Sequence, residues 1–334
     1  MNIRNKVIWI CSCMVMLIVF IMLNGTGIAD YISSVKQSAA VLTMSAPKLT
    51  EEQKGNLQEL IVQEASKRKI APIDARIDRV WKAIPGYNGL EVDVKQTYEQ
   101  TIASGSDSPI LYVYKEVPPQ INLQQLGPLP IYRGNPEKKM ASFMINVAWG
   151  NEYITPILDT LEKENVKATF FLDGSWLKKN PEIALQIQAK GHEMSNHAYS
   201  HPNMSELNRQ AAYAQISKTE DLLKATLNVN NKWFAPPSGD FNQMTVQVAA
   251  EQGLQTVLWT IDTVDWMKPA PDRIINKISS KLEPGSLILM HPTASSSQAL
   301  AGMIHVIKQR GYSLGTVSET LSSDRIPPAV ETVH

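Results

Sequence analysis

Histidines and carboxylates that could perform metal or acid–base chemistry fall into three short clusters. His197 and His201 are four residues apart, a spacing that on one helical turn would point both rings the same way and suit one divalent metal. Asp262 and Asp265 follow one apolar run, and His291 directly follows another. A single His after a buried strand is more often structural than catalytic. Three polar clusters after separate predicted strands instead indicate one shared site.

These clusters lie in a region that alternates strictly between predicted strands and helices. The predicted strands are Ala141–Val147, Ala168–Leu172, His192–Ser195, Trp233–Ala235, Thr256–Ile261, Ser286–Met290 and a last one near Tyr312–Thr316. The predicted helices are Tyr153–Glu164, Trp176–Lys190, Met204–Ala225, Asn242–Gln252, Pro271–Lys281 and Ser297–Arg310. Such alternation requires a parallel sheet covered by helices. We expect an α/β fold, a distorted (β/α) barrel of about seven parallel strands, with an open doubly wound sheet as the alternative. Both folds gather functional groups at the C-terminal ends of their strands.

The N-terminal residues 1–29 predict export from the cytoplasm. A basic start precedes the apolar run Val7–Leu23, which small residues follow. This pattern is typical of a signal peptide or of a membrane anchor, and the two alternatives stay open. Both predict an extracytoplasmic protein, either secreted or held to the membrane by this segment. Cys11 and Cys13 both lie within the run, so the exported part has no disulfide.

Three further segments separate this run from the barrel. Residues 30–47 are small and polar and are expected to form a tether, and residues 48–116 are predicted to form a small α+β domain. The elements expected in that domain are a helix from Thr50, a short helix over Ala75–Ile84, and strands over Gly89–Val94 and Ile110–Tyr114. A Pro-rich linker, residues 117–137, then leads to the barrel domain at residues 138–325.

The charge balance bears on the class of partner. The chain carries 32 Lys and Arg residues against 32 Asp and Glu residues, a formal net charge of zero. Nucleic-acid-binding domains usually carry a basic excess, so nothing in the charge favours a nucleic-acid partner. An uncharged polymer such as a glycan fits this balance.

Several segments of the barrel domain match the motifs of one known family. They are Asn165–Phe171, Gly191–Pro202, Lys218–Glu220, Phe234–Gly239, Asp262–Trp266 and Leu289–His291. On these segments the region from about Lys138 to Leu321 resembles the NodB-type polysaccharide deacetylases, which are carbohydrate esterases, and within them a sporulation-associated branch. The resemblance implies metal-assisted removal of acetyl groups from an N-acetylated cell-wall or spore-wall glycan. Peptidoglycan is the expected partner, and chitin-like oligomers are the alternative.

The resemblance also implies roles for particular residues. His197 and His201 correspond to the pair that holds a divalent metal, usually zinc. His291 corresponds to the acid that protonates the leaving amine, and Asp265 to the carboxylate that orients it.

The chain departs from the family pattern at the other catalytic positions. Where the family has two adjacent Asp residues, one the base and one a metal ligand, this chain has Ala148 and Trp149. The Arg that supports the base is Ala235, and a following Tyr is Ser238. Losing the base together with its Arg is chemically consistent, because an Arg without a carboxylate would be an unpaired charge. We expect any metal to bind weakly or not at all.

Three hypotheses about function stay open. In the first the chain is a deacetylase, and Asp173, Asp240 or Asp262 replaces the missing carboxylates. In the second it is a catalytically impaired glycan-binding protein, with Trp149 and Trp266 offering ring faces to sugars unless they pack in the core. In the third it is a sporulation assembly factor whose small domain contacts a partner protein.

Overall fold

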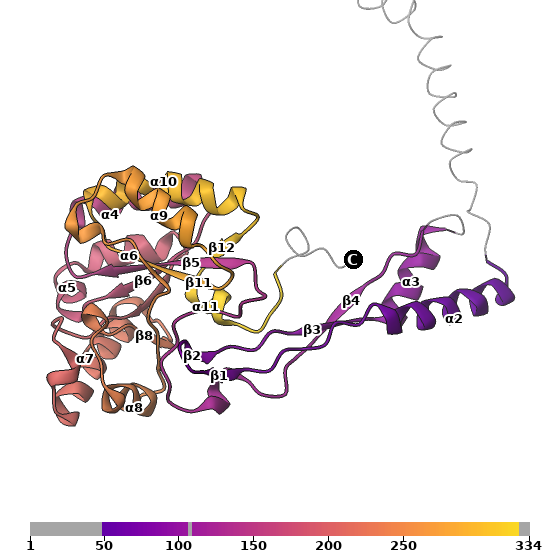
Figure 1. Ribbon diagram of the computed structural model, residues 1–334, viewed down its shortest axis with the longest axis horizontal. Helices are drawn as coiled ribbons and strands as arrows, with labels where there is room; N and C mark the ends of the chain where they lie inside the picture. The colour runs from indigo at the N-terminus through magenta and orange to yellow at the C-terminus, as the bar shows by residue number, and fades with distance from the viewer. Residues whose placement is uncertain (1–48, 106–108, 327–334) are drawn as a thin grey trace, which may run out of the picture. The chain divides into compact units, whose positions relative to one another are not determined.

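Figure 1 shows the computed structural model, which describes residues 49–105 and 109–326. The predicted signal peptide or anchor and the predicted tether therefore lie outside the described residues. Within the described ranges, no helix combines the length and the apolar character needed to cross a bilayer.

The contacts divide the chain into two compact units. One holds residues up to Glu64 together with Asp93–Val113, and the other holds Ala65–Val92 together with the chain from Tyr114 onward. The first unit contains most of α2 (Glu51–Lys67), the helix predicted from Thr50, and α3 (Val94–Ser104), which the sequence analysis did not predict. The contacts group residues 65–92 with the barrel, and the predicted domain boundaries stay predictions.

The short helix predicted over Ala75–Ile84 is wrong, because these residues form an antiparallel hairpin of β1 (Arg76–Asp78) and β2 (Lys82–Ile84). The carboxylate of Asp78 accepts hydrogen bonds from the backbone N–H groups of Val80 and Trp81, both at 2.8 Å. Aspartate favours this local turn over a helix, which explains the error. Nearby, β3 (Gly89–Val92) pairs antiparallel with β4 (Tyr114–Val117), so the strand expected from Ile110 begins four residues later.

The main sheet confirms the predicted parallel α/β arrangement. Its strands are β5 (Met140–Val147), β6 (Thr169–Leu172), β7 (Glu193–Asn196), β8 (Trp233–Phe234), β9 (Gln255–Thr256), β10 (Ile261–Asp262), β11 (Ser286–Met290) and β12 (Ser313–Gly315). Their order is β10-β11-β5-β6-β7-β8-β9, all neighbours are parallel, and β12 also pairs with β5. The segment Thr256–Ile261, predicted as one strand, is instead divided between β9 at one end of this order and β10 at the other. The sheet is therefore curled into a half-barrel, not spread flat.

In the described part of the chain, seven helices cover the outside of this sheet. They are α4 (Asn151–Lys163), α5 (Gly174–Lys179), α6 (Pro181–Ala189), α7 (Arg209–Leu227), α8 (Gln243–Glu251), α9 (Pro271–Lys281) and α10 (Ala294–Gln309), and α4, α9 and α10 gather on one side (Figure 1). The short helix α11 (Val317–Leu321) instead packs against the inner face, where its Val317 and Leu321 side chains join the cluster that holds Met144. The helix predicted over Trp176–Lys190 is divided into α5 and α6. The division falls at Asn180, which precedes a proline and leaves the helical region of backbone angles.

Side-chain alternation along β5 connects the core to the site. Phe143 and Ile145 pack against the helices in one buried cluster, whereas Met144 packs inside the curled sheet in another. Because successive side chains of a strand point to opposite faces, Asn146 and then Ala148 follow on the inner face. Both line a pocket at the C-terminal ends of the strands.

Candidate functional site

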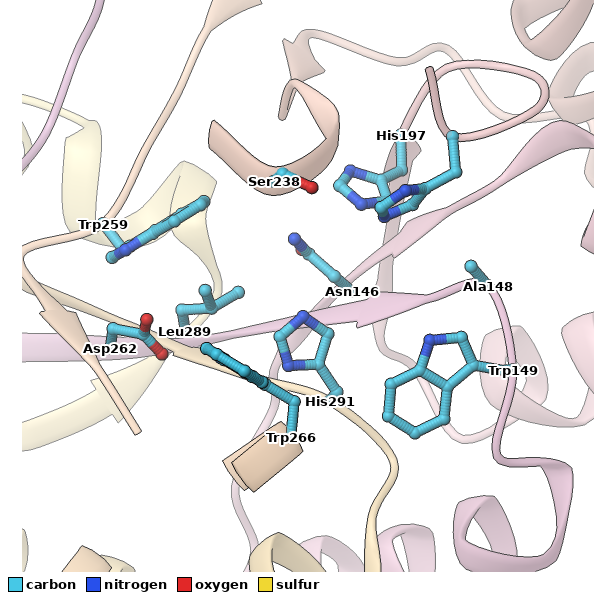
Figure 2. A pocket seen from close by; sticks show the side chains of 11 residues that line it. Asn146, Ala148, Trp149, His197, Ser238, Trp259, Asp262, Trp266, Leu289 and His291 are labelled. Atoms are coloured by element: carbon cyan, nitrogen blue, oxygen red, sulfur yellow. The ribbon is translucent and has the colours of Figure 1, made fainter. Parts of the chain in front are cut away.

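A pocket of about 420 Å³ opens where the parallel strands end (Figure 2). Its lining residues are Asn146, Ala148, Trp149, His197, His201, Ser238, Trp259, Asp262, Trp266, Leu289 and His291. Six of the nine residues predicted for the site are among them. The other three lie outside this lining: Asp265 lies behind His291, Asp173 lines a neighbouring hollow, and Asp240 is hydrogen-bonded to Ser205. No lysine or arginine lines the pocket in the part of the chain that the structure describes.

His291 and Asp265 form a tightly held pair. One carboxylate oxygen of Asp265 accepts the backbone N–H of His291 at 2.6 Å, and the other is 2.8 Å from the His291 Nδ1 atom. Asp265 is fully buried, while the His291 side chain is partly open to the pocket. Because the carboxylate engages Nδ1, the ring presents Nε2 to the pocket. This arrangement fits an oriented imidazole that donates a proton to a bound group.

A strained turn places Asp265 behind His291. The 3-10 turn η4 (Asp265–Met267) lies between Val264 and Lys268, which adopt left-handed φ angles of 56° and 54°. A valine rarely tolerates this conformation, and such strain gathers at functional sites. The turn buries Asp265 completely yet leaves Trp266 57% exposed at the pocket.

His197 and His201 also meet, although not on a helical turn as predicted. The segment is a loop in which Ala198 and His201 have left-handed φ angles of 58° and 54°. The loop brings the two ring centroids to 5.2 Å. His197 Nδ1 lies 2.7 Å from the carbonyl oxygen of Ala235, which leaves Nε2 free for other contacts. Burial, and after it the neighbouring His201 ring, lowers the pKa of His197 to about 3, so this ring is neutral near pH 7.

The residues present do not complete the zinc site that the resemblance implies. Throughout residues 49–105 and 109–326, no three His, Cys, Asp or Glu side chains gather closely enough to hold a metal ion. A neutral imidazole suits a metal, so His197 and His201 supply two donors of the right kind. Ala148 and Trp149 occupy the positions where the resemblance expects carboxylates, and their side chains offer no oxygen. Zinc therefore stays a prediction.

Trp149 lines the pocket and contacts His291. Its indole stacks on the His291 ring, with centroids 5.9 Å apart and planes 10° apart. Gly150 has a φ of 84°, and a Cβ atom there would lie 2.0 Å from the Pro292 carbonyl oxygen, so the chain passes very close to the residue after His291. Trp149 is 47% exposed and, like Trp266, lies at the pocket surface, outside the core.

The three predicted substitute carboxylates lie in different surroundings. Asp262 lines the pocket and accepts the Val264 N–H at 2.8 Å, but Figure 2 shows it beside Leu289 and away from His197. Asp240 lies outside the pocket lining, and both of its oxygens bond to Ser205 at 2.8 Å. Asp173 lines a neighbouring hollow and caps helix α5. The structure therefore does not bring any of them to the histidine pair as a third ligand.

Five residues of the pocket lining were not predicted as site residues: Ala148, Ser238 and Leu289, which were named only as motif positions, and Asn146 and Trp259. Asn146 is buried, and its side-chain oxygen has no hydrogen-bond partner among the described residues. The alternation of β5 could have indicated its inward direction. Trp259 lies between β9 and β10, where the predicted strand is interrupted, and no pattern in the sequence marks it.

Comparison with known proteins identifies the family. The family model described as polysaccharide deacetylase matches residues 133–257. The uncharacterized protein YlxY of Bacillus subtilis is 43% identical over 92% of this chain and 94% of its own length. The peptidoglycan-N-acetylglucosamine deacetylase of Bacillus cereus is 36% identical over 52% of this chain and 65% of its own length.

A solved structure extends this likeness to most of the chain. Wild-type BA3943 of Bacillus anthracis, a CE4 family pseudoenzyme, is 43% identical and superposes with a TM-score of 0.75 over 81% of this chain and 96% of its own. A BA3943 mutant of the same fold is described as having restored enzymatic activity. This chain belongs to the polysaccharide deacetylase family, and within that family it is similar to YlxY over nearly its whole length.

Proposed function

We propose that this chain acts on an N-acetylated glycan of the cell wall or spore wall by binding one acetylated sugar in the pocket. We further propose that it hydrolyses the acetamido C–N bond slowly, because only part of the catalytic set is present. The observation that carries this proposal is the His291–Asp265 pair, which is complete and faces a pocket with exposed tryptophans.

The aromatic lining supports a sugar ligand. Trp149, Trp259 and Trp266 all line the pocket, and two of them are about half exposed. Sugar rings have apolar faces that pack well on indole, while their hydroxyl and acetamido groups need hydrogen bonds at the rim. The buried side-chain oxygen of Asn146, which lacks a partner among the described residues, can accept one of them.

The pair accounts for one half of a deacetylation. Hydrolysis adds water to the acetyl carbon, breaks the C–N bond and requires a proton on the departing nitrogen. His291 Nε2 faces the pocket and can supply that proton, while Asp265 keeps the ring oriented.

The groups that would activate the attacking water are missing. Ala148 cannot accept the proton of the attacking water, and a general base typically contributes about 100- to 10,000-fold. We therefore expect turnover that is slow by at least this factor. The relatives support this proposal from both sides, since one is a peptidoglycan deacetylase and another a pseudoenzyme for which a mutant with restored activity exists.

We also propose that the protein acts outside the cytoplasmic membrane. An enzyme or binding protein for cell-wall glycan must reach the outside of the cytoplasmic membrane. The basic start and apolar run of residues 1–29 support export, with the chain either secreted or anchored there. A role in sporulation is part of the same proposal.

Calorimetric titration with fully N-acetylated chitooligosaccharides tests the proposal. We expect saturable binding that Trp266→Ala weakens by about tenfold, because a stacking face is lost. Trp81→Ala is the matched control, because Trp81 lies outside the pocket and contacts Arg133 and Tyr132. Undetectable binding, or equal weakening by both variants, would contradict the proposal.

A further inference from the structure

A second hollow of about 330 Å³ adjoins the pocket, and we call it the side hollow. Its lining residues are Ala148, Trp149, Asp173, Ser175, Ser200 and His201. Three of these, Ala148, Trp149 and His201, also line the pocket. The two cavities therefore share a wall, and we call them together the groove. A polymer with one sugar in the pocket can extend a neighbouring sugar toward the side hollow.

Asp173 gives the side hollow its chemical character. Its Oδ1 atom accepts the Trp176 N–H at 2.9 Å and the Ser175 hydroxyl at 2.6 Å, so it caps helix α5. Its Oδ2 atom is buried and has no hydrogen-bond partner among the described residues. Asp173 is only 2% exposed. A buried carboxylate oxygen without a partner is costly, so a ligand that supplies a donor there gains a strong interaction.

The surroundings favour a cationic donor over a neutral one. Of the residues lining the side hollow, Asp173 is the one carboxylate, and in the described chain no lysine or arginine lines it. Ser175 and Ser200 add hydroxyl groups that suit sugar hydroxyls. A protonated amine can form a charge-assisted hydrogen bond with Oδ2, roughly twice as strong as a neutral one. An acetamido group at the same position is larger and carries no charge.

We propose that the side hollow binds the protonated amine of a deacetylated amino sugar, next to the acetylated sugar in the pocket. This inference rests on the proposed function, and it defines the ligand as a partly deacetylated glycan. The chain would then recognise the product of another deacetylase, at the boundary between acetylated and deacetylated sugars.

Calorimetry on the full chain with two chitopentaoses, one partly deacetylated and one fully N-acetylated, tests this inference. We expect the partly deacetylated pentamer to bind about tenfold more tightly, consistent with one hydrogen bond to a charged group. The preference should shrink as salt is added, because the interaction is ionic.

Asp173→Asn is the decisive variant. Asparagine caps helices as well as aspartate does, so α5 is expected to keep its start while the charge is lost. The variant should lose the preference and bind the two pentamers with equal affinity. Asp93→Asn is the matched control, since Asp93 caps α3 and lies outside the groove lining. It should keep the preference.

The outcomes separate this inference from the proposed function. If the wild-type chain binds both pentamers equally, or if the preference survives in Asp173→Asn, the inference is overturned and the proposed function stands. If neither pentamer binds, the proposed function fails and the inference with it. A preference that reappears only when a divalent cation is added would assign Asp173 to a metal and overturn the amine proposal.

Discussion

The two sides of the pocket differ in how firmly the fold holds them. The donor side, His291 with Asp265, is buried and hydrogen-bonded through both backbone and ring. The altered side, Ala148 and Trp149, follows strand β5, and its larger residue is 47% exposed. Asp265 therefore stabilises the fold as well as orienting His291. The residues at positions 148 and 149 can change without disturbing the core.

The largest expected effect comes from rebuilding the altered side. In Ala148→Asp/Trp149→Asp, the two carboxylates of the family pattern would return beside His197 and His201. We expect the rate of acetate release from N-acetylated chitooligosaccharides to rise about 100- to 10,000-fold over the unmodified chain. Adding His291→Ala to this variant should abolish most of the gain. No increase would show that the donor side is no longer competent.

Removing the donor-side carboxylate should act on stability. Asp265→Ala leaves the buried N–H of His291 without its acceptor and removes two short hydrogen bonds. We expect the free energy of unfolding to fall by about 3 kcal/mol in denaturant titration. Trp149→Asp should change it by about 1 kcal/mol or less, because the site is half exposed. Equal losses in the two variants would remove the difference between the two sides.

Zinc titration should sharpen the same comparison. The unmodified chain should bind zinc weakly, because two histidines act without a carboxylate. Trp149→Asp supplies a third ligand, and since even outer partners change metal affinity by 10- to 100-fold, we expect a gain of about 100-fold. His197→Ala in that variant should remove it. Tight zinc binding by the unmodified chain would mean that another residue already completes the site.

The smallest effect is expected for Asp262→Asn. Asp262 lies in the pocket but away from the histidine pair, and its Oδ1 atom accepts a hydrogen bond from the Val264 N–H. The residual rate of acetate release should change less than about twofold, because no proton transfer depends on this carboxylate. A loss approaching 100-fold would identify Asp262 as a substitute base and restore the hypothesis of a full enzyme.

Elements whose sequence signals are local were predicted best. Ser286–Met290 and Pro271–Lys281 match the structure at both ends, because an uninterrupted apolar run and a proline at a helix start are local signals. The hairpin over 76–84 was missed because an aspartate side chain replaces helical hydrogen bonds. The helix over Val94–Ser104 was missed because its buried positions are threonines.

The site was predictable in its members but not in its geometry. The histidine pair comes together through left-handed Ala198 and His201, which no periodic pattern indicates. Asp240 was predicted as a possible substitute carboxylate, yet both of its oxygens accept hydrogen bonds from Ser205. Trp259 reaches the pocket only because the chain leaves the sheet between β9 and β10.

A crystal structure of the chain with a partly deacetylated chitooligosaccharide tests the central claim most directly. It should show an acetamido nitrogen hydrogen-bonded to His291 Nε2 and a sugar ring against Trp149 or Trp266. An oligosaccharide bound elsewhere on the chain, with the pocket free of sugar, would contradict the proposal that this pocket recognises the glycan.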